Sequence, residues 1–180
     1  MIVVIPAYEP DEKLLRVVAE LKRDTDYAIV VVNDGSSEAA EPVFAALPEG
    51  VTLLRHAQNR GKGRALKTAY EYIAAHFPQS EGIVTVDADG QHLPADVVRV
   101  SEDWEAHPET LVLGSRRFTG TVPWRSRAGN AITRVVFRLS TGVSVYDTQT
   151  GLRAFAVSRI PMMLEMRGER YEYEINVLLY

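Results

Sequence analysis

Two carboxylates stand one residue apart directly after an apolar run of the sequence. Asp87 and Asp89 follow residues 82–86, whose sequence is GIVTV and is typical of a buried strand. Because side chains alternate along an extended backbone, both aspartates leave the end of that strand on the same side and can share one cation. Two hard oxygen ligands suit Mg²⁺ or Mn²⁺, which complete their coordination with waters and substrate phosphates. The pattern indicates a diphosphate site, and its alternative is an Asp-Gly surface turn.

Short apolar runs alternate with helical patterns over the first two thirds of the chain. We expect strands at 2–5, 28–32, 51–55, 82–86 and 110–114, and helices at 12–22, 38–46, 63–76 and 95–107. This order predicts an α/β fold with a mainly parallel central sheet flanked by helices, in one domain spanning residues 1–180. Beyond residue 119 we expect a helix near 128–139 and strands at 152–156 and from Tyr171 onward, where Tyr171, Tyr173 and Ile175 alternate with glutamates.

Polar residues follow the carboxyl ends of several predicted strands. The segments that contain these polar residues are Pro6-Ala7-Tyr8-Glu9, Asn33-Asp34-Gly35-Ser36, Asp87 with Asp89, and Ser115-Arg116-Arg117. Taken singly, each is also a good turn or helix cap. Ligands of open α/β sheets bind outside the carboxyl ends of the strands, so together these segments predict one binding crevice.

A glycine-rich segment opens the predicted helix at 63–76. Its residues are Asn59-Arg60-Gly61-Lys62-Gly63-Arg64-Ala65. Backbone N–H groups at the helix N-terminus, with Lys62 beside them, favour a phosphate or nucleotide contact. An ordinary solvated helix start is the open alternative, because the segment matches neither a P-loop nor a dinucleotide-binding fingerprint.

Composition narrows the classes of partner. The chain has 180 residues, 46% of them apolar and 24% charged, a net charge of −4 and no cysteine. These values exclude thiolate chemistry and give no general attraction to nucleic acid. Nothing approaches the ~20 apolar residues of a membrane span. Six arginines nevertheless gather between Arg116 and Arg138 without an acidic residue, which indicates a local anionic partner.

In this order, the motifs resemble those of family 2 glycosyltransferases. The segments that carry the likeness are residues 5–9, 32–36, 59–65, 87–91, 114–116 and 147–153. The likeness is to the branch of dolichyl-phosphate mannose synthases and polyprenyl-phosphate glucosyltransferases and extends over nearly the whole chain. It implies a GT-A (Rossmann-like) fold and inverting, metal-dependent transfer of a hexose from a UDP- or GDP-sugar to a polyprenyl monophosphate, with Mg²⁺ or Mn²⁺, at the cytoplasmic face of the cell membrane.

The resemblance also implies roles for individual residues. Pro6, Ala7, Tyr8, Glu9 and Ala88 would line the nucleotide-sugar pocket with Gly61 and Lys62, and Asp34 would accept hydrogen bonds from the base. Asp87, Asp89 and Gln91 would hold the metal and diphosphate. Arg116 and Arg127 would grip phosphate, and Asp147 would act as base or orient the acceptor. If the acceptor is a phosphate, it is already anionic and needs no strong base; a sugar hydroxyl would require Asp147 to remove a proton.

Several alternatives stay open. The chain could instead be a soluble family 2 transferase that acts on a saccharide or protein hydroxyl, or a catalytically silent nucleotide-sugar binding module. Relatives of this branch commonly carry further membrane-associated helices, and this chain ends within an apolar segment; we expect that such a C-terminal region is absent here. His92 is a second candidate for the metal or donor site, whereas His56, His76 and His107 are expected at the surface. Trp104 is expected on the buried face of its helix.

Overall fold

The central sheet has six strands in the order β3-β2-β1-β4-β6-β5 within the part of the chain that the computed structural model describes, residues 1–114 and 150–179. The strands are β1 (Ile2–Ala7), β2 (Ala28–Asn33), β3 (Val51–Arg55), β4 (Gly82–Thr85), β5 (Val112–Leu113) and β6 (Arg153–Ala156). β1 pairs in parallel with β2 and β4, and β2 with β3, whereas β6 runs antiparallel to β4 and β5. The expected α/β fold with a mainly parallel sheet is confirmed.

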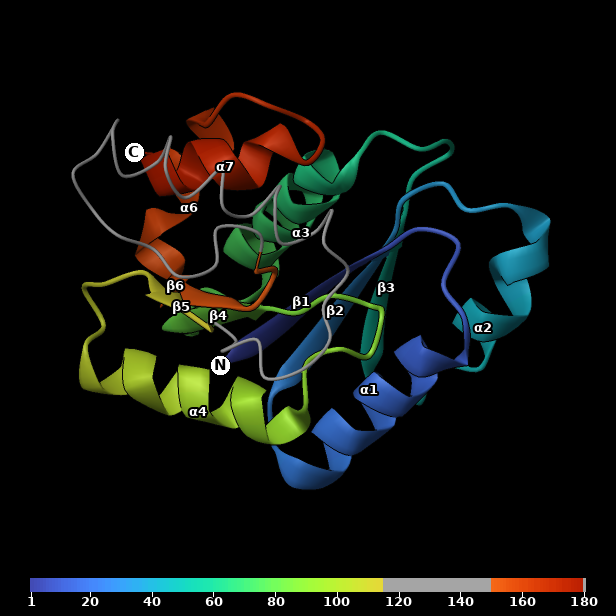
Figure 1. Ribbon diagram of the computed structural model, residues 1–180, viewed down its shortest axis with the longest axis horizontal. Coiled ribbons are helices and arrows are strands. Elements are labelled where there is room, and N and C mark those ends of the chain that lie inside the picture. Colours follow the sequence, from blue (N-terminus) through green and yellow to red (C-terminus); the bar gives the residue numbers. More distant parts are fainter. Residues whose placement is uncertain (115–149, 180) are drawn as a thin grey trace, which may run out of the picture.

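Helices cover both faces of this sheet. They are α1 (Glu12–Asp24), α2 (Glu41–Ala45), α3 (Lys62–His76), α4 (Pro94–Ala106), α6 (Ile160–Glu165) and α7 (Glu172–Leu179). Figure 1 shows α1 and α4 on one side of the sheet and α3, α6 and α7 on the other. Because both faces are covered, β1 and β2 are apolar on nearly consecutive residues rather than on alternate ones.

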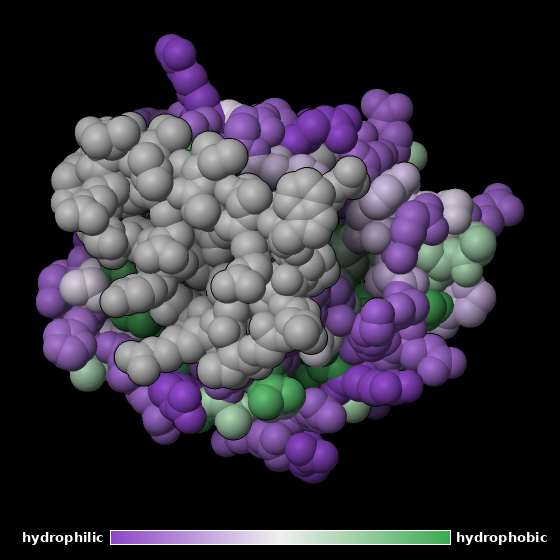
Figure 2. Space-filling model, viewed as in Figure 1, coloured by the Kyte–Doolittle hydropathy of each residue, from purple (hydrophilic) through white to green (hydrophobic). Residues whose placement is uncertain are grey.

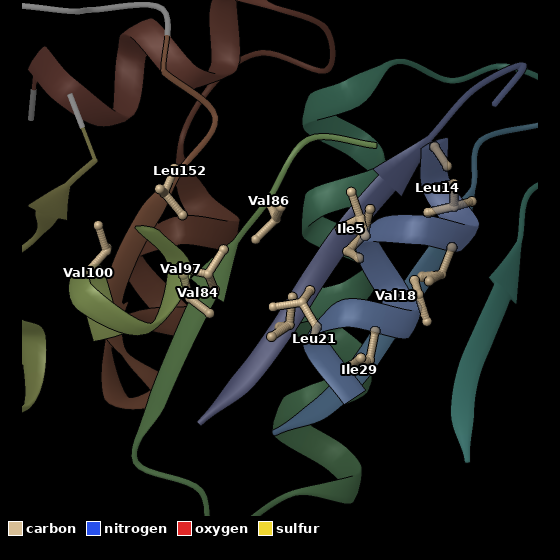
Figure 3. Close-up of a cluster of buried hydrophobic side chains, with 14 of the residues drawn as sticks. Ile5, Leu14, Val18, Leu21, Ile29, Val84, Val86, Val97, Val100 and Leu152 are labelled. Carbon is tan, nitrogen blue, oxygen red and sulfur yellow. The ribbon is translucent and has the colours of Figure 1, made fainter. Parts of the chain in front are cut away.

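Two apolar clusters fill the space between the layers. On one face, Leu14, Val18 and Leu21 of α1 pack toward Ile5 and Ile29 of the sheet (Figure 3). These α1 side chains recur at helical spacing, and the helix begins where the Asp11 side chain accepts the N–H of Lys13. α4 continues this cluster and buries Trp104, as expected. The second cluster packs α3, α6 and α7 against the opposite face.

The structure departs from the predicted elements at three places. The helix expected at 38–46 is a 3-10 turn (Glu38–Ala40) followed by the short α2, and the strand expected at 110–114 shrinks to Val112–Leu113. The strand expected from Tyr171 is wrong, because this segment forms the helix α7. There Tyr173, Glu174 and Val177 are the buried residues, a helical spacing. The helix expected near 128–139 lies outside the described residues.

Candidate functional site

A cavity of about 700 Å³ opens at the carboxyl ends of β1, β2 and β4. Segments far apart in the sequence line it: the loop after β1, the residue after β2, the start of α3, the loop after β4 and the start of α7. The lining residues are Pro6, Ala7, Tyr8, Glu9, Pro10, Asp11, Lys13, Asp34, Asn59, Gly61, Lys62, Ala65, Asp87, Ala88, Asp89, Arg170, Tyr171, Glu174 and Ile175. The crevice predicted at the strand ends is therefore a pocket that gathers most of the site residues predicted from the sequence.

The loops after β1 and β2 are tied together by Glu9. Its backbone N–H donates to the hydroxyl of Ser36 at 2.9 Å, and its carboxylate accepts the N–H of Ser37 at 2.6 Å and the Ser37 hydroxyl at 3.0 Å. Glu9 has a φ of 48°, in the left-handed region that non-glycine residues seldom occupy. These contacts hold the backbone in that conformation beside the pocket.

Asp34 is buried and receives hydrogen bonds from three N–H groups. Oδ1 accepts the backbone N–H of Arg60 at 2.9 Å and lies 2.6 Å from Nδ1 of His56, and Oδ2 accepts the N–H of Gly61 at 2.8 Å. Gly35, at φ +68°, lets this loop approach the backbone of Gln58 and Asn59 so closely that a Cβ would overlap it. Asp34 thus fixes the backbone that leads into α3. The N–H groups of Arg60 and Gly61 donate to Asp34 and do not point at a ligand.

His56 is not the surface residue that the sequence indicated. Its side chain is 5% exposed, and Nε2 lies 2.9 Å from the hydroxyl of Thr68. The histidine is buried because it joins the end of β3 to Asp34 and to α3. No local pattern reveals this partner, since Asp34 and Thr68 lie in other elements.

Asp87 sits in a crowded, charged environment. Its carboxylate lies 2.7 Å from Nζ of Lys62 and 3.5 Å from Nε2 of His92, and it packs against the Cα of Gly151. Burial raises the pKa of Asp87, but the hydrogen bond from His92 and the charge of Lys62 outweigh it and hold the pKa well below its usual range. Asp87 is therefore ionised and fixed in position.

Lys62 bridges this aspartate to α7. Its Nζ lies 2.8 Å from Oε2 of Glu174, whose other oxygen lies 3.9 Å from Arg153. Arg153 in turn donates to the backbone oxygens of Thr150 and Glu174. Burial lowers the pKa of Lys62, but Glu174 and Asp87 outweigh it and raise the pKa above its ordinary value. Lys62 and Arg153 thus neutralise Asp87 and Glu174 in one network of ion pairs beside the pocket.

The start of α7 closes the pocket over the glycine-rich segment. The backbone oxygen of Glu169 accepts the N–H of Arg64, and its carboxylate pairs with Arg64 at 2.5 Å and with Lys67 at 3.3 Å. Gly63 allows this contact, because a Cβ there would lie 2.5 Å from that of Tyr173. Sequence reasoning missed Arg170, Tyr171, Glu174 and Ile175 because α7 was taken for a strand.

Asp89 differs from Asp87 in being exposed. Its carboxylate accepts the backbone N–H of Gln91 at 2.9 Å and the Gln91 side-chain amide at 2.6 Å. Carboxylate and amide oxygens are the hard donors that Mg²⁺ and Mn²⁺ prefer. No group of three or more His, Cys, Asp or Glu in the described part of the chain is arranged to hold a metal. The donor set fits a cation whose coordination is completed by phosphate oxygens.

The predicted residues Arg116, Arg127 and Asp147 lie outside the described residues. Among the residues that the structure describes, no helix is both long and apolar enough to cross a membrane. The described surface in Figure 2 is mainly hydrophilic, with apolar residues as separate spots. Tyr8 and Tyr171 are large exposed apolar side chains, and both line the pocket.

Comparison with known proteins finds similar glycosyltransferases. The chain is 31% identical over 193 residues to the UDP-N-acetylglucosamine–dolichyl-phosphate N-acetylglucosaminyltransferase of Methanococcus voltae, covering 94% of this chain and 74% of that one. It is 28% identical to the polyprenol monophosphomannose synthase of Mycolicibacterium smegmatis, covering 86% and 60%. Relatives of the polyprenyl-phosphate branch thus bear out the resemblance seen in the sequence.

A solved structure shows the same fold. It is glucosyl-3-phosphoglycerate synthase from Mycobacterium tuberculosis, in complex with Mn²⁺, UDP and glucosyl-3-phosphoglycerate, with a TM-score of 0.70 and 20% identity. The match covers 96% of this chain, which spans 61% of the length of that one. The family model described as glycosyl transferase family 2 matches residues 2–160. The chain belongs to glycosyl transferase family 2 and has the GT-A fold of its glycosyltransferases.

Proposed function

We propose that this chain transfers a hexose, with inversion, from a nucleoside-diphosphate sugar to a polyprenyl monophosphate in the presence of Mg²⁺ or Mn²⁺. The observation that carries the proposal is the single pocket that joins Asp34, Lys62, Asp87 and Asp89 at the carboxyl ends of the strands. The names of the dolichyl-phosphate and polyprenol relatives support the lipid-phosphate acceptor.

The pocket divides into a base end and a diphosphate end. Asp34, which lines the pocket together with Tyr8 and Glu9, would offer an acceptor to the nucleobase, and Asp89 with Gln91 would hold the cation beside Asp87. A divalent cation at this place would stabilise the negative charge that develops on the leaving nucleoside diphosphate. Lys62 and His92 hold Asp87 in a fixed orientation, so the carboxylate does not need to reorganise when the donor arrives.

The acceptor would enter beside this site from a membrane surface. Arg116 and Arg127 remain candidates for gripping its phosphate, because the guanidinium fork matches phosphate oxygens bidentately. A lipid phosphate is largely anionic at neutral pH and attacks without a strong base, which leaves Asp147 as an orienting group. We place the reaction at the cytoplasmic face of the cell membrane, through peripheral contact.

The test is a transfer assay with a panel of nucleotide sugars and three acceptors: a short-chain polyprenyl phosphate, the matching polyprenol and a free saccharide. We expect product with the lipid phosphate alone and its loss on addition of EDTA. Arg116→Ala and Arg127→Ala should depress transfer while nucleoside-diphosphate affinity stays within a few fold. Arg99→Ala, at an exposed position on α4, is the matched control.

Other outcomes separate the alternatives. Transfer to the saccharide with none to the lipid phosphate would identify the hydroxyl-directed transferase. Nucleotide-sugar binding without transfer to any acceptor would identify a binding module.

A further inference from the structure

The hydrogen bonds around Asp34 limit what its carboxylate can still accept. A carboxylate offers about four acceptor positions. Among the described residues, His56 and the N–H of Arg60 occupy two positions on Oδ1, and the N–H of Gly61 occupies one on Oδ2. One acceptor position remains on Oδ2, and Asp34 lines the pocket.

His56 is held so that it keeps its position on Oδ1. A carboxylate cannot donate, so Nδ1 carries the hydrogen that points at Asp34, and Nε2 lies within hydrogen-bond distance of the Thr68 hydroxyl, at 2.9 Å. With this partner on its far side, the ring is fixed from both ends. The carboxylate therefore cannot rotate to offer both oxygens to a ligand without breaking buried hydrogen bonds.

The nucleobases differ in the donors that they present to such a group. Uracil and thymine carry one ring N–H, at N3, between two carbonyls. Guanine presents an N–H and an adjacent NH₂, which pair best with two carboxylate oxygens side by side. Cytosine and adenine place a ring nitrogen acceptor next to their NH₂, and that nitrogen would face the carboxylate without a hydrogen between them.

We propose that His56, with the N–H groups of Arg60 and Gly61, restricts Asp34 to one acceptor and so selects a donor whose base has a single imide N–H, a uridine- or thymidine-diphosphate sugar. This inference rests on the proposed function, because it names the base of the donor that the pocket takes. His56 acts through Asp34 and is a positioning residue. A buried hydrogen bond left unmade corresponds to about ten- to hundredfold in affinity.

The decisive measurement uses the unmodified chain and Mn²⁺ in calorimetry with UDP, dTDP, GDP and N3-methyl-UDP. We expect UDP or dTDP to bind at least tenfold more tightly than GDP and than N3-methyl-UDP, which lacks the hydrogen. The ratio of UDP to dTDP affinity distinguishes uracil from thymine. Equal affinity for UDP and N3-methyl-UDP, or tighter binding of GDP, would overturn the inference. Failure of every nucleotide to bind would instead refute the proposed function.

A variant pair tests the part assigned to His56. His56→Phe keeps a ring of similar size and removes the hydrogen bond to Oδ1 of Asp34, so both carboxylate oxygens can accept and the ratio of GDP to UDP dissociation constants should shrink toward one. His76→Phe, at an exposed position where the histidine stacks on Tyr72, should leave that ratio unchanged. A folded His56→Phe protein with the wild-type ratio would show that the histidine is merely structural.

Discussion

Gly151→Ala tests whether the exact placement of Asp87 matters for this pocket. A Cβ on residue 151 would lie 2.2 Å and 2.3 Å from the two carboxylate oxygens of Asp87. Ordinary contact begins at 3.4 Å, so the carboxylate must retreat by roughly 1 Å, a misplacement that can cost about 10²-fold in rate. A shift of that size would also disturb the 2.7 Å contact between Asp87 and Lys62.

The expected cost of Gly151→Ala is about 1–3 kcal/mol in the free energy of unfolding, the usual penalty for overpacking. Urea denaturation measures it, and calorimetry with a nucleoside diphosphate and Mn²⁺ measures the loss of binding. The matched control is the double-mutant cycle with Asp87→Ala, in which the added methyl group meets no carboxylate. There Gly151→Ala should be nearly neutral. An equal cost in both backgrounds, or wild-type stability and binding in Gly151→Ala, would refute the reasoning.

Three further changes test other parts of the site. Asp89→Asn should abolish most of the gain in nucleoside-diphosphate affinity that Mn²⁺ gives, measured by calorimetry with and without EDTA. Lys62→Met should cost about 3 kcal/mol of stability, because it removes the cation shared by two largely buried carboxylates, and adding Glu174→Gln should recover part of the loss in urea denaturation. The hydrogen bond from Arg64 lowers the pKa of Glu169 below its ordinary 4.5. The Arg64–Glu169 ion pair should therefore stabilise the fold fully above pH 4.5, and this stabilisation should be lost as the pH falls through the lowered pKa. Because Glu169 is half exposed, Glu169→Gln should cost less than about 1 kcal/mol at pH 7. The difference in melting temperature from wild type should vanish as the pH falls through the lowered pKa of Glu169.

Strand ends and buried runs were predictable because they depend on local patterns. The apolar residues of β1 and β2 are buried on both faces, as consecutive apolar residues indicate. Asp34, Asp87 and Asp89 meet in one pocket because parallel strands end at the same edge of the sheet. The sheet itself therefore brings these acids together, and its strand pattern was sufficient to predict the meeting.

The predictions that failed concern residues whose burial depends on polar and charged partners in distant segments. Periodicity treats Glu174 as a solvent-facing residue, which made the segment from Tyr171 look like a half-buried strand. In the structure Glu174 is buried beside Lys62 and Arg153, so the buried residues recur with a helical period. His56 was misjudged for the same reason, since its burial depends on Asp34 and Thr68.

The wall formed by α7 and the residues just before it connects the strand-end site to a part of the chain beyond the family match. That match ends at residue 160, yet Arg170, Tyr171 and Glu174 line the pocket. Glu174 is linked to Asp87 through Lys62, and Glu169 anchors the same segment to the start of α3. Any displacement of α7 must therefore change the surroundings of Asp87 as well as the width of the cavity. If the pocket binds the donor as proposed, substitutions in this C-terminal segment should alter donor binding without changing the strand-end aspartates.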